Sequence, residues 1–138
     1  MRNTLGKPWV SIGSGGATHG NDLPVGETPL PHGYGAFARV LGNYVREERL
    51  LDLEEAIHKM TGMNAAKLQL RNRGLLQVGM KADITIFDAE RISSSATFLE
   101  PRRFAEGGEY VIVNGTPVSD GGRALDARPG KFLYGPGK

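Results

Sequence analysis

The sequence predicts an α+β protein in which helices precede a small antiparallel β-unit. Apolar residues recur with helical spacing between residues 36 and 49, which indicates a helix with one buried face. A β-branched and aromatic run of strand length occupies residues 84–87. Asn114-Gly115, between two further strand-like runs, is the strongest short signal of a β-hairpin. We therefore divide the chain into a helical part, residues 1–72, and a β-rich part, residues 73–138.

The helical part begins with a short apolar run and a long loop. Residues 9–12 predict one buried strand, with Pro8 before it and a cluster of glycines after it. Residues 17–35 are rich in glycine and proline and predict a loop, and ordered loops of this length are often functional. The helix that follows has its apolar residues on one face: Phe37, Val40, Leu41, Tyr44 and Val45.

Two further helices are expected before the β-rich part. Asp52 is a favourable N-cap residue, and Glu55 three positions later completes a pattern like a capping box. This second helix should end near Gly62. A third, short helix is predicted to begin at Asn64.

Residues 73–88 form the stretch that joins the two parts. Gly74 and Gly79 allow backbone angles that other residues avoid. Asp83 and Asp88 bracket the run at residues 84–87, which predicts a buried strand. On composition alone, this stretch is also compatible with an ordinary edge of a β-domain.

At least two more strands should follow. Residues 110–113 are strand-like, and the hairpin signal at Asn114-Gly115 predicts that residues 116–119 return beside them. Asp120-Gly121-Gly122 predicts another turn, and residues 131–134 predict a last strand.

The composition excludes several classes of function. The chain has 138 residues, 39% of them apolar and 23% charged, which is typical of a globular domain. The net charge is only +2 and basic residues do not cluster, so no nucleic-acid partner is expected. No cysteine is present, which excludes disulfides and thiolate metal sites. Without an apolar run of membrane-spanning length or a signal peptide, no membrane partner and a cytoplasmic location are expected.

Short motifs spread over residues 8–133 act together as a family signature. They are Pro8-Trp9-Val10-Ser11-Ile12-Gly13-Ser14, Tyr34-Gly35-Ala36-Phe37, Arg39-Val40-Leu41-Gly42, Leu53-Glu54-Glu55-Ala56-Ile57, Lys59-Met60-Thr61-Gly62, Arg73-Gly74-Leu75-Leu76, Gly79 with Ala82-Asp83, Val113-Asn114-Gly115 and Ala127-Arg128-Pro129-Gly130. This combination resembles the C-terminal part of the N-acyl-D-amino-acid deacylases (D-aminoacylases) of the amidohydrolase superfamily. The resemblance implies the last strand and final helices of a metal-dependent (β/α)8 barrel, followed by part of a small antiparallel β-sandwich.

The resemblance also implies where the site residues should lie. In the family the last barrel strand ends in Ser-Asp-Gly, and this Asp is implied to sit at the metal centre and act as general base. The matching residues here are Ser14-Gly15-Gly16, so Gly15 occupies the Asp position and no catalytic residue is expected. An Arg that grips the substrate carboxylate in the family falls on or near His32. His32 and Tyr34 are thus the candidate substrate-binding residues.

No metal ligand is expected in this chain, although the intact family uses zinc. The three histidines, His19, His32 and His58, do not have the spacing of ligands on one helix or strand. A weak divalent-metal site around His19 and His32, with Asp22 and Glu27 nearby, remains an alternative. Asp22 also remains open as a substitute for the missing base.

The resemblance implies a truncated part of an enzyme that hydrolyses the amide bond of N-acyl-D-amino acids. In the intact family the metal polarises the carbonyl and activates water, while a carboxylate moves the proton to the leaving amine. We expect this chain to be inactive alone and to meet such a substrate only if the rest of the barrel is supplied. The alternative is a non-catalytic binding or self-association module, because exposed strand edges and apolar helix faces favour homo-oligomers.

Overall fold

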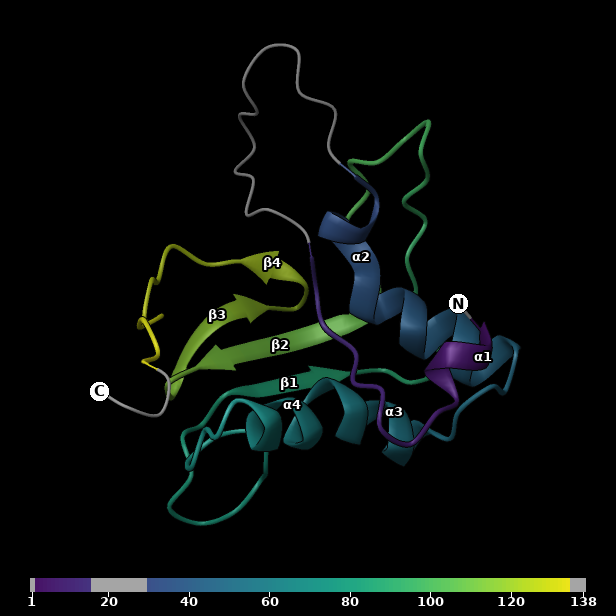
Figure 1. Cartoon of the computed structure of the whole chain (residues 1–138). Coiled ribbons are helices and arrows are strands. Elements are labelled where there is room, and N and C mark those ends of the chain that lie inside the picture. Colours follow the sequence, from purple (N-terminus) through teal and green to yellow (C-terminus); the bar gives the residue numbers. More distant parts are fainter. Residues whose placement is uncertain (1, 16–29, 135–138) are drawn as a thin grey trace.

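The computed structural model describes residues 2–15 and 30–134, which form helices and a four-stranded antiparallel sheet (Figure 1). The helical elements come first along the chain, as expected, and the sheet follows. The elements are α1 (Arg2–Leu5), α2 (His32–Arg39), η1 (Val40–Glu47), α3 (Leu53–Met60), α4 (Gly62–Lys67), β1 (Ile84–Phe87), β2 (Gly108–Val113), β3 (Thr116–Asp120) and β4 (Arg123–Ala124). A division into two parts at residues 72 and 73 stays a prediction.

The predicted helix over residues 36–49 is confirmed, but it begins earlier. Its first turn is at His32, so residues 32–35 belong to α2 and not to the predicted loop, whose residues 17–29 lie outside the described part. Gly35 kinks α2, with φ −162° and ψ 25°. The continuation, η1, is a π-helix, and at its end the Glu48 N–H donates to the Asn43 carbonyl five residues back, at 2.8 Å.

Helices α3 and α4 follow the predicted order. Asp52 takes the extended backbone of an N-cap residue, with φ −72° and ψ 155°, but its side chain makes no capping hydrogen bond. The predicted capping box is therefore wrong. The Glu55 carboxylate lies 3.3 Å from the Lys59 ammonium one turn later, which takes it away from the helix N-terminus. Helix α4 begins at Gly62, two residues before the predicted start.

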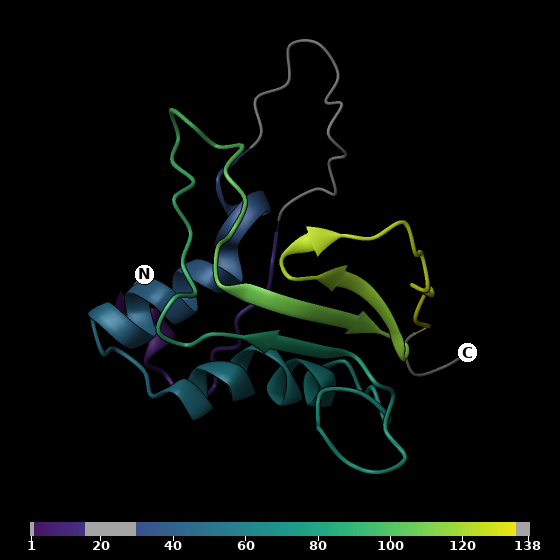
Figure 2. The ribbon, with the colours of Figure 1, turned by 180° about the vertical axis from the view of Figure 1, so that it is seen from behind.

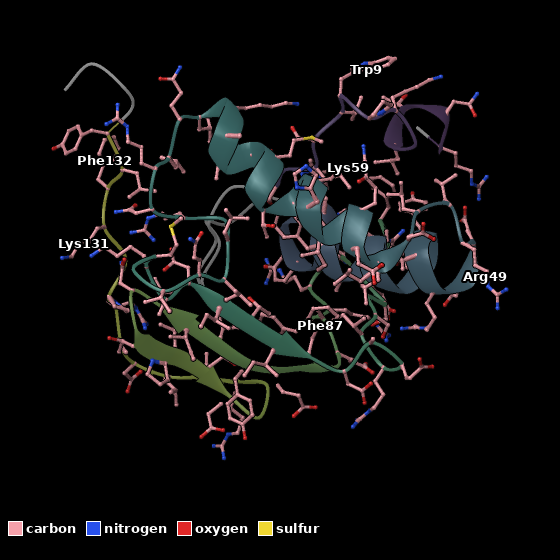
Figure 3. All side chains as sticks on the ribbon, turned by 90° about the horizontal axis from the view of Figure 1, so that it is seen from below. Trp9, Arg49, Lys59, Phe87, Lys131 and Phe132 are labelled. Carbon is pink, nitrogen blue, oxygen red and sulfur yellow. The ribbon has the colours of Figure 1, made fainter. Side chains whose placement is uncertain are left out.

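The predicted strand at residues 9–12 is wrong. This segment is irregular, and the Trp9 side chain points outward and is 69% exposed (Figure 3). A four-residue helix, α1, precedes it. Only Ile12 is buried in the core. A strand needs a paired neighbour, and side chains of α3 and α4 occupy one edge of this segment in place of a strand.

The sheet has the order β1-β2-β3-β4 with every neighbouring pair antiparallel. The turn between β2 and β3 has φ 48° at Asn114 and φ 81° at Gly115, so the predicted hairpin is confirmed as a turn with both central residues left-handed. Strand β1 lies where predicted, but it is not fully buried. Ile86 pairs with Tyr110 across the strands, and these side chains are 49% and 44% exposed.

The predicted last strand at residues 131–134 is also wrong. These residues form no strand, and the sheet of the described chain ends at the two-residue strand β4 after the Gly121-Gly122 turn. Phe132 projects from the segment and is 81% exposed (Figure 3). The apolar residues of this segment, which suggested a strand, therefore do not contribute to the hydrophobic core in this structure.

The core lies where α2–η1, α3 and the end of β1 meet. Its buried residues are Ile12, Ala38, Val40, Leu41, Leu51, Ala56 and Ile92, with Phe87 packed against them. Arg46 of η1 donates to the Ala89 and Ile92 carbonyls at 3.0 and 2.7 Å, which joins the helix to the segment after β1. The loop at residues 94–105 stands beside α2 in both orientations (Figure 2).

An exposed ion pair joins α1 to the end of η1. Arg2 donates to both carboxylate oxygens of Glu48, at 2.7 and 2.9 Å. This hydrogen bonding holds the pKa of Glu48 below its ordinary value. Because the pKa of Glu48 is lower in the folded state than in the unfolded state, the ion pair stabilises the fold at pH values above the unfolded-state pKa. This contribution is lost as the pH falls through the folded-state pKa.

We expect Arg2→Gln to return the pKa of Glu48 toward its ordinary value. Carboxyl chemical shifts followed by NMR over an acid titration measure this directly. The effect on stability should be small, because exposed ion pairs contribute little. An unchanged Glu48 titration in the variant would show that the pair does not persist in solution.

Candidate functional site

A cavity of about 470 Å³ lies between the N-terminal segment, α2–η1 and residues 96–98. Its wall is mostly apolar, with Ile12 from the segment, Val40 from the helix and Phe98 from the loop. The polar side chains at its wall include His32 and Arg39. A concave, largely apolar space with few polar groups is the usual form of a binding site.

Three contacts hold the loop against α2 and so form one wall of this cavity. The Arg39 guanidinium donates a hydrogen bond of 2.6 Å to the Ala96 carbonyl. The Tyr34 and Phe104 rings pack edge to face, with centroids 5.7 Å apart. At the kink of α2, Gly35 is in such close contact with Ser94 that an added Cβ would overlap the serine side chain. The absence of a side chain at Gly35 therefore lets the loop approach the helix.

The three site positions predicted from the sequence, Gly15, His32 and Tyr34, lie in different surroundings. Gly15 is exposed at the end of the described N-terminal segment, and a Cβ added there would meet no atom within 4 Å. His32 is exposed and lines the cavity together with Ser11 and Gly13. Tyr34 is half-buried and is held by Phe104. His32 and the segment that leads to Gly15 therefore line the same cavity, whereas Tyr34 contacts the loop.

Sequence reasoning missed the residues that position the N-terminal segment. Lys59 of α3 is fully buried, and its ammonium donates to the Lys7 carbonyl and, at 3.0 Å, to the Val10 carbonyl. Asn64 donates to the Ile12 carbonyl at 2.7 Å, and Lys67 donates to the Trp9 carbonyl at 2.8 Å. Figure 3 shows Lys59 on α3 beneath this segment. No local pattern signals this role, because lysine is usually exposed.

The described residues do not fit a zinc site. Within residues 2–15 and 30–134, no group of three or more histidine, aspartate or glutamate side chains could hold a metal ion. His58 is exposed on α3, away from the cavity wall. The alternative site that combines His32 with His19, Asp22 and Glu27 depends on residues outside the described part.

No helix in the described part of the chain has both the length and the apolar character needed to cross a membrane.

Comparison with known proteins defines the class. The model of a family described as "Amidohydrolase family" matches residues 14–119. The chain belongs to the amidohydrolase family. It is similar to an N-acyl-D-aspartate deacylase of Alcaligenes xylosoxydans xylosoxydans, with 45% identity over 91% of this chain and 24% of the relative.

Solved structures agree with this assignment. A crystal structure of D-aminoacylase matches with a TM-score of 0.82 and 39% identity over 92% of this chain and 25% of that protein. An N-acyl-D-glutamate deacylase from Bordetella bronchiseptica, solved with zinc and a phosphonate inhibitor, matches with a TM-score of 0.76 and 38% identity over 85% of this chain and 23% of that one. The chain thus spans about a quarter of the length of the relatives it matches.

Proposed function

We propose that the chain carries the C-terminal part of an N-acyl-D-amino-acid deacylase and does not hydrolyse N-acyl-D-amino acids by itself. In this proposal, residues 1–72 correspond to the last strand and final helices of the barrel, and residues 73–138 to part of the β-sandwich. Similarity to deacylases over most of the chain, but over only a quarter of their length, supports the assignment.

The observation that carries the proposal is Gly15. The resemblance puts the catalytic Asp of the family at this position, and glycine has no side chain that could accept a proton or hold a metal. The position is open to solvent and has room for a side chain. His32, on the cavity wall, and Tyr34, whose ring contacts Phe104 of the neighbouring loop, remain the proposed substrate-binding residues.

The direct test is hydrolysis of N-acetyl-D-aspartate, N-acetyl-D-glutamate and N-acetyl-D-leucine by the purified chain, with and without added zinc. We expect amine release at the rate of the buffer alone under both conditions. The matching L-amino acid derivatives serve as controls for contaminating hydrolases. Zinc-dependent release from the D-derivatives would contradict the proposal and would assign a new metal site to this chain.

A second experiment tests the role of position 15. The matching quarter of a D-aminoacylase is replaced by the 138-residue chain, once with Gly15 and once with Gly15→Asp. A carboxylate general base contributes about 10²–10⁴-fold, so the Gly15→Asp chimera should hydrolyse substrate faster by about this factor. Gly15→Asn, which adds similar volume without a base, is the matched control. Equal rates for the three chimeras would show that position 15 is not the base position.

A non-catalytic module is the second candidate. The exposed loop side chains favour it, since Phe98 and Leu99 are 82% and 94% exposed. Large apolar side chains exposed at neighbouring positions can mark an interaction surface. A discrete homodimer in size-exclusion chromatography with light scattering would support self-association, and a monomer at all concentrations would argue against it.

A further inference from the structure

Nitrogen-bearing side chains stand on the wall of the cavity beside α2 without an acidic counterpart. His32 and Arg39, at the two ends of α2, both line the cavity. No acidic side chain in the described part of the chain lines it with them. An anionic group inside the cavity would therefore meet hydrogen-bond donors and no negative charge.

Arg39 uses only one of its donors within the described part of the chain. Its half-buried guanidinium gives one hydrogen bond, of 2.6 Å, to the Ala96 carbonyl, and has further N–H groups available. Among residues 2–15 and 30–134, no carboxylate lies at ion-pair distance from it. Because hydrogen bonds between a guanidinium and a carboxylate are stronger than neutral ones, a carboxylate is the ligand group that fits this position best.

Apolar side chains form most of the remaining wall. Ile12 and Val40 are buried there, whereas Phe98 lines the cavity and is still 82% exposed. Contact with a ligand would remove the Phe98 ring from water, which is favourable. A second polar group, such as the amide of an N-acyl amino acid, would meet few partners on this wall, and burial of an unpartnered amide costs free energy. The rest of the ligand is therefore an apolar tail.

The size of the cavity limits that tail. Its volume of about 470 Å³ lies within the range of about 300–1,000 Å³ that is usual for small-molecule sites. We propose that the chain binds a free medium-chain alkanoate here, with the carboxylate at Arg39 and His32 and the alkyl tail against the apolar wall. Such binding requires neither a base at position 15 nor a metal, so it can fail while the deacylase assignment stands, and the reverse.

The experiment is isothermal titration calorimetry of the 138-residue chain with hexanoate, octanoate and decanoate, each below its critical micelle concentration. We expect one binding site and an affinity that rises about 3-fold with each added methylene, because each methylene moves from water to the apolar wall. Amide chemical shifts followed by NMR should change at Ala36, Arg39 and Phe98. An affinity that does not depend on tail length, or shift changes confined to other parts of the protein, would overturn the proposal.

Ligands with the same tail and a different head group test the carboxylate contact. Octan-1-ol and octyltrimethylammonium should bind at least about 10-fold more weakly than octanoate, because neither offers an anion to Arg39. Equal affinities would show that the tail alone binds and would overturn the proposal. N-acetyl-D-leucine is titrated in the same way. If it binds more tightly than octanoate, the cavity is a deacylase substrate site, and the alkanoate inference is wrong.

Arg39→Met removes the guanidinium and keeps an apolar side chain. We expect the affinity for octanoate to fall about 10-fold or more and the affinity for octan-1-ol to stay the same. Arg91→Met, at an exposed arginine outside the cavity, is the matched control and should bind like the original chain. Equal losses for the acid and the alcohol would show that Arg39 only supports the loop through Ala96, which would overturn the carboxylate contact. Circular dichroism verifies folding, and if Arg39→Met does not fold, the head-group comparison on the original chain decides.

Ala36→Leu tests the position of the tail. Ala36 is half-buried and lines the cavity, so a larger side chain there occupies space that the tail needs. Octanoate and octan-1-ol should both bind more weakly to this variant. Ala66→Leu, at an exposed position of α4 outside the cavity, is the matched control and should bind both ligands like the original chain. Unchanged octanoate binding by Ala36→Leu would place the ligand elsewhere and would contradict the proposal.

Discussion

Lys59→Met should lower the free energy of unfolding by about 2–4 kcal/mol. Methionine keeps the apolar stem but removes the ammonium, so the Lys7 and Val10 carbonyls lose their donor and the Glu55 carboxylate loses its partner. Lys59 is fully buried, so water cannot replace these hydrogen bonds without a rearrangement of the segment. Urea denaturation followed by circular dichroism measures the change.

Lys67→Met is the matched control for this prediction. Lys67 also donates to the segment, through the Trp9 carbonyl at 2.8 Å, but it is exposed. Water can take over its hydrogen bonds, so we expect a loss below about 1 kcal/mol. Amide exchange at Ile12, whose N–H donates to the Lys59 carbonyl, should accelerate in Lys59→Met and not in Lys67→Met. Equal losses in the two variants would show that burial of Lys59 does not position the segment.

Gly107→Ala should destabilise the protein by about 3 kcal/mol, through backbone strain and overlap together. Gly107 has φ +80°, a conformation that residues with a Cβ rarely adopt. An added Cβ would lie 2.5 Å from the Ile92 nitrogen and 2.7 Å from the Arg91 carbonyl carbon, and both are backbone atoms. Since Gly107 follows the Ser93–Glu106 bridge that closes the loop, the loop that carries Phe98 should loosen as well. Thermal denaturation and proteolysis of the loop measure both effects.

Gly115→Ala is the control that separates the backbone strain of a positive φ from the steric overlap of an added Cβ. Gly115 has φ +81°, almost the same as Gly107, but a Cβ there would meet nothing within 4 Å. Only the strain of the left-handed conformation remains, and we expect a loss of about 1 kcal/mol. If the two variants lose the same stability, close packing at Gly107 contributes nothing, and the loop does not depend on this contact.

One part of the candidate site can be predicted from the sequence, and another part cannot. The replacement of the family Asp by Gly15 can be read directly from a short motif, because it concerns the identity of one residue. The cavity cannot be read in this way. Its wall combines Ile12, Val40 and Phe98, which are far apart in the chain and come together only through the packing of the loop and of the N-terminal segment on the helices.

The sequence by itself determined the elements that depend on neighbouring residues. The helix after Asp52 and the hairpin at Asn114-Gly115 lie where predicted, because the helical spacing of apolar residues and left-handed turn residues act within a few positions. Tertiary structure alone decided the rest. Residues 9–12 are apolar enough for a strand, but strand formation requires a paired neighbour, and buried Lys59 binds this segment through its side chain. The burial of a lysine depends on carbonyl groups supplied about fifty residues away, and no local pattern contains that information.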